Sequence, residues 1–419
     1  MNNRHWIIFS ISVSLFLISL FYRVSSAIIA VDLSRDLNLR AQDLGLLGAA
    51  FFYSFALIQI PLGLILDRIG ARMTMLVLNI IGIIGTIIFA QASGLAGGVI
   101  GRSLLGIGMA ANLMGTLKLL TNWFDLRKFA TLSGLALSLG TLGSLAATSP
   151  LALLVQMFGW RMSFYLLAGL HAFLTLCLFL FVSDMPLEKQ APDLTRPDDM
   201  PVTSALASMK TLFGSWSYWA ISFSIFLRYG SFASIQALWA GPFLILYLGF
   251  SPVSAGNLLL ILSIGLILGS PIGGMLSDRV FRSRKIIIIM GTFVTAAATF
   301  ALSRYQSPSL TFLLGLIFFL LGFFISFGQV SYAHIRELMP KEMSGTAMTG
   351  INFFVMMGAA VFIHGLGAVM QRADPNFSST GEAYQTAFLI CSAALLTAAS
   401  LYATTREPTK LQIHQSSNS

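Results

Sequence analysis

Twelve apolar stretches, each about as long as a bilayer is thick, constrain this chain more than any other feature. Charged or Gly- and Pro-containing breaks separate them, and they lie near 6–30, 43–66, 73–92, 97–120, 130–153, 162–182, 212–237, 253–276, 286–303, 309–333, 344–370 and 383–403. A helix needs about 20 apolar residues to cross the hydrocarbon core, where all backbone polar groups must be bonded within the chain. The pattern predicts an all-α polytopic membrane protein with twelve transmembrane helices in two pseudo-symmetric six-helix bundles.

The composition excludes several other classes of protein. Apolar residues make up 56% of the chain and charged residues only 10%, whereas soluble domains are about 25% charged. The two cysteines lie inside apolar stretches and give no disulfide framework. No basic cluster alternates with aromatic residues, so we expect the net charge of +9 to reflect cytoplasmic loops and not a nucleic-acid partner.

The longest polar stretch divides the chain into two halves. It contains Pro186, Pro192, Pro197 and Pro201, and prolines in a polar run are typical of linkers. We therefore predict an N-terminal six-helix bundle at 1–183, a cytoplasmic linker at 184–208, a C-terminal six-helix bundle at 209–404 and a cytoplasmic tail at 405–419.

The distribution of Lys and Arg predicts the orientation. With the N-terminus in the cytoplasm, most Lys and Arg residues lie on the cytoplasmic side, and the opposite side holds only Arg35, Arg40, Arg161, Arg304 and Arg372. The positive-inside rule then places both termini in the cytoplasm. The start of the chain also has the pattern of a signal peptide, with Arg4 ahead of an apolar run. We favour a retained first helix, because the run continues past Arg23 and a similar pattern recurs in the second half.

Two motifs occur once in each half, in the same order. Gly63-x3-Asp67-Arg68 matches Gly274-x3-Asp278-Arg279, and Phe21-Tyr22-Arg23 matches Phe226-Leu227-Arg228. Parallel repeats of this kind are typical of transporters.

The first of these motifs continues through Gly70 to Arg72. It predicts a cytoplasmic latch, that is, a set of contacts that holds the two halves of the protein together on the cytoplasmic side. Gly63 would let a neighbouring helix approach closely. Asp67 would accept hydrogen bonds from a helix N-terminus, and Arg68 and Arg72 would bind nearby carboxylates. Gly274, Asp278 and Arg279 would form the counterpart. Ordinary loop charge is the alternative, but it explains neither the glycine spacing nor the repeat.

Buried arginines predict the substrate class. An arginine at bilayer depth costs about 2.5–3.5 kcal/mol on insertion scales, and we find no carboxylate in the middle of any span. Arg23 and Arg228 would face a central cavity and hold an anion through bidentate pairs. The alternative is bonding to backbone carbonyls, or pairing of Arg23 with Asp32. Neighbouring polar groups that would complete the pocket are Tyr22, Tyr229, Gln236 and Asn112.

The segment Gly63–Arg72 resembles the loop signature of the major facilitator superfamily at every defining position. Arg102-x3-Gly106-x-Gly108 is similar to the fourth-helix motif of that superfamily, and the resemblance implies a role for Arg102 in coupling. Tyr22-Arg23 resembles the first helix of organic anion:cation symporters, and Leu227–Gly230 resembles the seventh helix of organophosphate:phosphate antiporters.

This resemblance implies a secondary transporter of the bacterial inner membrane that moves a small organic anion, a carboxylate or phosphate ester, by alternating access. The symporters carry acidic residues where this chain has Tyr22 and the run Met109-Ala110-Ala111. Proton coupling through those carboxylates is therefore not expected, and transport would be driven either by protons through other groups or by exchange for a second anion. An exporter of drugs or metabolites with the same fold is the alternative. We expect a monomer, and no enzyme activity, metal or cofactor, because the sequence shows no P-loop, metal-ligand spacing or nucleophile–base pair.

Overall fold

The computed structural model describes residues 4–124, 126–185, 214–306, 310–339, 344–374 and 381–407; within them, the side chains of Asp67, 126–131 and 344–349 are not described. Most of the predicted linker 184–208 and of the predicted tail 405–419 lies outside the described residues. The predicted domain boundaries therefore stay predictions.

The described residues are almost entirely helical and contain no strand. Eleven helical stretches are long and apolar enough to cross a membrane, and Leu132–Ala146 supplies a shorter apolar helix. The first half consists of α1 (Arg4–Val24), α2 (Ser26–Asp36), α3 (Ala41–Ile69), α4 (Ala71–Ala90), α5 (Leu95–Met109), α6 (Asn112–Trp123), α7 (Leu126–Ala146) and α8 (Ser149–Phe181). The second half consists of α10 (Trp216–Ser234), α11 (Ala240–Pro242), α12 (Pro252–Met275), α13 (Arg284–Ser303), α14 (Thr311–Ile325), α15 (Val330–Leu338), α16 (Ser344–Ala373) and α17 (Gly381–Ala403).

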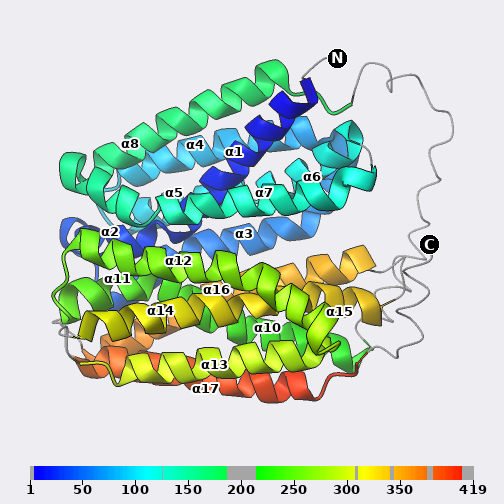
Figure 1. The fold of residues 1–419 in the computed structure, drawn as a ribbon. Coiled ribbons are helices and arrows are strands. Elements are labelled where there is room, and N and C mark those ends of the chain that lie inside the picture. The colour runs from blue at the N-terminus through cyan, green and yellow to red at the C-terminus, as the bar shows by residue number, and fades with distance from the viewer. Residues whose placement is uncertain are drawn as a thin grey trace.

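These helices form two bundles, one from each half of the chain (Figure 1). α1–α8 make the N-terminal bundle, and α10–α17 make the C-terminal bundle. α1 begins and α17 ends at the same end of the molecule (Figure 1), as an even number of crossings requires. The prediction of a twelve-helix, two-bundle membrane fold is confirmed.

Several spans are interrupted where the sequence suggested continuous helices. The first span changes direction at Ser25, and the fourth is broken at Ala110 and Ala111. Ser326–Gln329 forms a 3-10 turn between α14 and α15, and Ile235–Trp239 and Phe243–Tyr247 form π-helical turns around α11. Such turns are typical of hinges and functional sites.

The fifth span continues from α7 through a turn at Ala147 and Thr148 into the first part of α8, and the sixth span begins after the non-helical residue Gly159. This boundary lies between the predicted stretches 130–153 and 162–182. Pro150 stands in the first turn of α8, where its missing N–H costs nothing. Gly159 has φ +75°, a conformation that only glycine adopts readily.

The two bundles meet through bare backbone at one end of the molecule, which we call the closed end. A Cβ atom added to Gly241 before α12 would lie 1.6 Å from the Ala27 carbonyl oxygen of α2, and one on Gly367 of α16 would lie 3.1 Å from the Gly45 Cα of α3. At a third contact, the Ser149 hydroxyl of α8 donates to the Asn257 Oδ1 of α12 at 2.6 Å.

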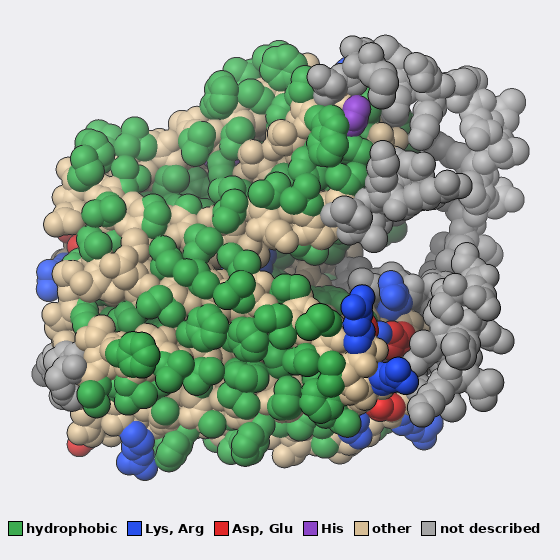
Figure 2. All heavy atoms as spheres, in the orientation of Figure 1, with side chains coloured by type: hydrophobic (Ala, Val, Ile, Leu, Met, Phe, Trp, Pro, Cys, Tyr) green, Lys and Arg blue, Asp and Glu red, His purple; other side chains and the backbone are tan. Residues whose placement is uncertain are grey.

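The opposite end, where α1 begins and α17 ends, is the open end (Figure 1). Figure 2 shows that the surface is hollowed between the two bundles on this side. The protein is therefore sealed at one end of the bundle interface and accessible from the other.

We predict that Gly241→Ala opens the closed end, because its Cβ would collide with the Ala27 carbonyl. Nitroxide labels on the exposed residues Met157 of α8 and Phe312 of α14, in a background with both native cysteines replaced by serine, should move apart in pulsed electron paramagnetic resonance. Gly169→Ala is the control, since a Cβ there meets nothing within 4 Å. An unchanged distance in folded Gly241→Ala protein would contradict the seal.

Candidate functional site

The two arginines that the repeat relates, one in each bundle, have no acidic partner among the described residues. Arg23 lies at the end of α1 and is partly exposed, and Arg228 of α10 is only 6% exposed. The ion pairs among the described residues involve neither of them. The Nε atom of each guanidinium is buried and has no hydrogen-bond partner. Each arginine therefore carries a positive charge and at least one donor that the described part of the chain leaves unsatisfied.

The immediate surroundings of the two arginines differ. The Arg23 guanidinium lies over the Phe55 ring, 5.2 Å from its centre, a cation–π contact that leaves its N–H groups free. The Arg228 Nη1 donates to the Ile325 carbonyl oxygen at 2.9 Å. Ile325 is the last residue of α14, directly before the 3-10 turn. The break in the tenth span thus supplies a carbonyl to the Arg228 side chain.

Tyr332 of α15 connects the two arginines. It lies within range of electrostatic interaction with Arg23, Arg228 and Tyr229, and its hydroxyl donates to Asn352 Oδ1 of α16 at 3.4 Å. Arg23 and Arg228 thus both act on one side chain, and their joint role in a binding site stays a prediction. Our sequence analysis missed Tyr332; the run of polar residues Ser331, Tyr332 and His334 inside the tenth span could have indicated it.

Two of the predicted pocket residues are partly exposed in the seventh span. Tyr229 follows Arg228 and interacts with Tyr332. Gln236 stands further along, on the π-helical turn Ile235–Trp239. Their part in binding stays a prediction.

Tyr22 and Asn112 are instead directed into the N-terminal bundle. Both are fully buried. The Tyr22 hydroxyl accepts a hydrogen bond from Thr86 at 3.2 Å, and Asn112 exchanges hydrogen bonds with Asn79 and donates to the Leu15 carbonyl. Tyr22 is next to Arg23 in sequence, but the helix turns it about 100° away. We therefore assign both residues to internal packing and leave them out of the proposed contacts.

Arg102 of α5 lies next to the break in the first span. Its Nη1 donates to the Tyr22 carbonyl at 3.0 Å, and the Ser25 hydroxyl donates to the same oxygen at 3.1 Å. The side chain is fully buried, with Phe51 5.1 Å from the guanidinium, and its Nε and Nη2 have no partner. Arg102 thus stabilises the backbone directly before Arg23. Its part in coupling stays a prediction.

The latch motif of the first half is organised by a residue that we did not predict. Asp184, after the end of α8, accepts the backbone N–H of Arg72 at 2.9 Å and so caps the N-terminus of α4. Gly70 has φ +92°, and a Cβ there would lie 2.7 Å from Asp184 Oδ2. Arg72 also donates to the Phe179 carbonyl at 2.7 Å. The turn is held tightly, as predicted, with Asp184 as the visible anion.

Other parts of the latch differ from the expectation. A Cβ on Gly63 would meet nothing within 4 Å, so the prediction that Gly63 admits a neighbouring helix is wrong for this conformation. The opening at this end leaves the glycine without a partner helix. Arg68 is exposed, and the Asp67 side chain lies outside the described residues.

The counterpart in the second half is centred on Arg284 of α13. Its guanidinium forms ion pairs with Asp278 and, at 2.8 Å, with Glu337 of α15. Gly274 faces open space, and Arg279 is exposed. Figure 2 shows this group of charged side chains at the open end of the C-terminal bundle. Arg284, at the start of α13, therefore links Asp278 after α12 to Glu337 at the end of α15.

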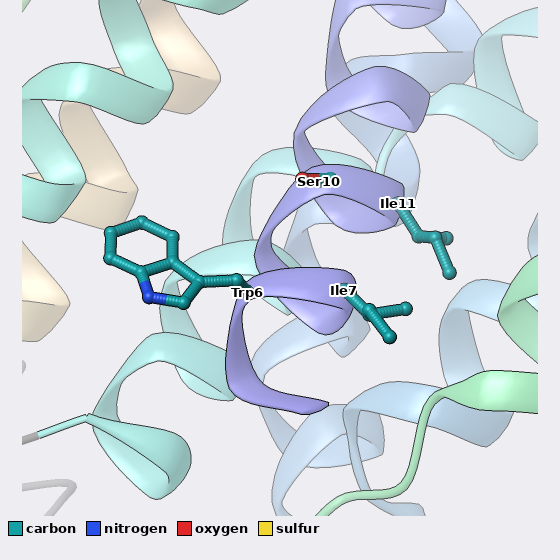
Figure 3. A pocket seen from close by; sticks show the side chains of 4 residues that line it. All are labelled: Trp6, Ile7, Ser10 and Ile11. Atoms are coloured by element: carbon teal, nitrogen blue, oxygen red, sulfur yellow. The ribbon is translucent and has the colours of Figure 1, made fainter. Parts of the chain in front are cut away.

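An apolar depression at the start of α1 is a poor candidate for an anion site. Trp6, Ile7, Ser10 and Ile11 line it, and all four come from the first turns of one helix (Figure 3). Trp6 and Ile7 point to different sides of that helix, and no charged group lines the depression. It offers nothing that would recognise a negative charge.

We predict that Asn112→Ala lowers the stability of the protein without changing its affinity for a transported anion. The substitution leaves Asn79 and the Leu15 carbonyl short of partners, at a cost of about 1–3 kcal/mol for each buried group. Thermal unfolding of purified protein would show the loss, and uptake kinetics in proteoliposomes would show an unchanged KM. Thr121→Ala, at an exposed position of α6, serves as the control. A raised KM at unchanged stability would return Asn112 to the binding site.

Comparison with known proteins agrees with this architecture. The sequence model of the Major Facilitator Superfamily matches residues 11–363, and again 221–417. The chain is 26% identical to the hexuronate transporter of Bacillus subtilis (strain 168) over 289 residues, which cover 65% of this chain and 67% of the relative. It is 23% identical to the D-galactonate transporter of Escherichia coli O6:H1 over 406 residues, which cover 91% and 90%.

Solved structures share the fold. The D-xylose–proton symporter superimposes with a TM-score of 0.76 at 18% identity, covering 96% of this chain and 99% of that one. An inward-facing bacterial homologue of the lysosomal transporter Spinster gives a TM-score of 0.74 at 15% identity, covering 96% and 97%. The relatives and the structural neighbours are transporters and not enzymes. This chain belongs to the Major Facilitator Superfamily and is a secondary transporter.

Proposed function

We propose that this protein moves a small organic anion across the plasma membrane by alternating access, with Arg23 and Arg228 binding the anionic group. The observation that carries the proposal is the pair of guanidinium groups, one per bundle, without a described acidic partner. Both lie within electrostatic range of Tyr332. The anion would be a carboxylate or a phosphate ester, and Tyr229, Gln236 and Tyr332 would contact the rest of the solute.

Electrostatics favours an anion over a neutral solute. A buried charge without a counter-ion is strongly disfavoured in a low-dielectric interior, and an anion between the two bundles would relieve both arginines at once. A guanidinium binds carboxylate or phosphate through two parallel hydrogen bonds, which fits the unpaired Nε atoms. The names of the hexuronate and D-galactonate transporters support a sugar acid as the first class to test.

The bundle contacts support alternating access. The closed end is sealed by backbone contacts at Gly241, Gly45 and Gly256, and the opposite end is open (Figure 2). Rocking of the two bundles about Arg23 and Arg228 would exchange these states. With both termini in the cytoplasm, as the Lys and Arg distribution favours, the structure would correspond to an inward-open monomer.

The same charge balance favours exchange of anions as the driving process. No described carboxylate lies in the middle of a span to accept a proton in place of the substrate, since described acidic side chains such as Asp36 and Glu337 stand near helix ends. The empty site would carry two uncompensated positive charges, so its reorientation across the membrane is disfavoured until another anion binds.

We predict that Arg23→Gln and Arg228→Gln each abolish or strongly weaken anion uptake. Loss of a charge-assisted bidentate pair should raise KM roughly tenfold to a hundredfold. Uptake of labelled D-glucuronate, D-galactonate and glycerol 3-phosphate into proteoliposomes measures the effect. Arg304→Gln is the matched control, because Arg304 lies exposed after α13, over the Phe300 ring.

Unimpaired uptake in both variants would refute the assignment of these arginines. An exporter of amphipathic compounds is the alternative function. It would be favoured if cells expressing the Arg23→Gln, Arg228→Gln double variant kept drug resistance while the wild-type protein transported none of the three anions.

We predict that an anion inside the proteoliposomes accelerates uptake of labelled anion from outside. Proteoliposomes loaded with unlabelled D-galactonate should take up labelled D-galactonate faster than empty ones, and a protonophore should leave the rate unchanged. Proton coupling is the competing outcome: uptake would then depend on an imposed pH gradient and need no internal anion.

A further inference from the structure

Gly328 lies directly beneath the Arg228 guanidinium. A Cβ added to Gly328 would stand 1.2 Å from Nη1, 1.7 Å from Cζ and 1.9 Å from Nη2 of Arg228. No side chain except hydrogen leaves room for the guanidinium in this place. Gly328 belongs to the 3-10 turn Ser326–Gln329, and it is itself buried.

The guanidinium is withdrawn from the open space between the bundles. Arg228 is 6% exposed, and its Nη1 is bonded to the Ile325 carbonyl at the other side of the same turn. Tyr332 and Tyr402 lie within electrostatic range. In this position the arginine donates a hydrogen bond to a carbonyl at the break in the tenth span. It therefore cannot offer all of its N–H donors to a solute.

In an uninterrupted α-helix the Ile325 carbonyl would accept the N–H of Gln329. Here the turn is tighter, and the Val330 N–H bonds to the Phe327 carbonyl three residues earlier. Short 3-10 segments inside a helix are typical of hinges. The Ile325 carbonyl can accept two hydrogen bonds, so the Arg228 bond alone does not exclude the Gln329 N–H; what distinguishes this turn is that the guanidinium lies against it, in the space beside Gly328.

We propose that Gly328 is a positioning residue: it forms a resting position for Arg228, which the arginine occupies when no anion is bound and leaves when an anion binds. Departure of Arg228 removes the guanidinium from the space beside the turn, and the tenth span then closes into a continuous helix. α15 moves with it and carries Glu337, which is bound to Arg284 and through it to Asp278. Anion binding is thereby coupled to the charged group at the open end. The inference rests on the proposed anion binding by Arg228.

The first test compares Gly328→Ala with Gly365→Ala in full-length purified protein. A Cβ on Gly365 of α16 meets nothing within 4 Å, so this variant controls for the added methyl group. Binding of D-galactonate, D-glucuronate and glycerol 3-phosphate is measured by calorimetry, and the tightest binder then serves as probe. Because Gly328→Ala removes the competing position, we expect its Kd to fall roughly tenfold and its maximal exchange rate to fall as well. Gly365→Ala should match the wild type.

A merely structural role of Gly328 would not tighten binding, so a raised or unchanged Kd in Gly328→Ala would overturn the proposal. Arg228→Lys provides a second check, because a lysine lacks the planar group that lies on Gly328. In that background Gly328→Ala should no longer change the Kd.

The second test needs no substitution at Gly328 and remains decisive if that variant fails to fold. Hydrogen–deuterium exchange of the wild-type protein should slow in the peptide spanning 326–331 when the probe is added, because the turn becomes α-helical. Unchanged or faster exchange would overturn the proposal. If the wild type binds none of the three anions, or Arg228→Gln binds as well as the wild type, the proposed function itself fails. If only the Gly328 effects are absent, the resting position alone is refuted.

Discussion

The two uncompensated guanidinium charges are the constraint on which the rest of this structure depends. A positive charge in an apolar interior is tolerated only where dipoles or an exchangeable anion offset it. Arg228 obtains one dipole from the Ile325 carbonyl, and Arg23 obtains the face of the Phe55 ring. Neither contact neutralises the charge. The region between the bundles is thereby set up for a ligand of opposite sign.

In both halves, a carbonyl next to a helix break accepts a hydrogen bond from a buried arginine. In the N-terminal bundle, Arg102 of the fourth span bonds the Tyr22 carbonyl, beside the break in the first span. In the C-terminal bundle, Arg228 of the seventh span bonds the Ile325 carbonyl at the break in the tenth. The first and fourth spans correspond to the seventh and tenth in the repeat. The two halves thus use equivalent spans in opposite roles. The fourth span supplies the arginine and the first span the break in the N-terminal half, whereas the seventh span supplies the arginine and the tenth the break in the C-terminal half.

Much of the fold could be predicted from the sequence, because span length and apolar character are local properties. The equivalent positions of Arg23 and Arg228 in the two halves were also predictable, since they depend on a repeat that can be read along the chain. The direction in which a side chain points within a bundle could not be predicted from the sequence. Tyr22 and Asn112 were polar residues in the right spans, yet both are turned toward neighbouring helices of their own bundle. Tyr332 and Asp184 depend on contacts between distant segments, and no spacing along the chain encodes those contacts.

The glycines at the closed end have a consequence for the energetics of the cycle. Gly241 and Gly256 bring main chain against main chain without an ion pair between the bundles among the described residues. Separating such surfaces gives up dispersion contacts and the Ser149–Asn257 hydrogen bond, and among the described residues it leaves no isolated charge behind. A seal of this kind can part and re-form with little dependence on salt, whereas the ion pairs of Arg284 with Asp278 and Glu337 at the open end are sensitive to ionic strength. The two faces of the transporter would then respond differently to the same change of solution.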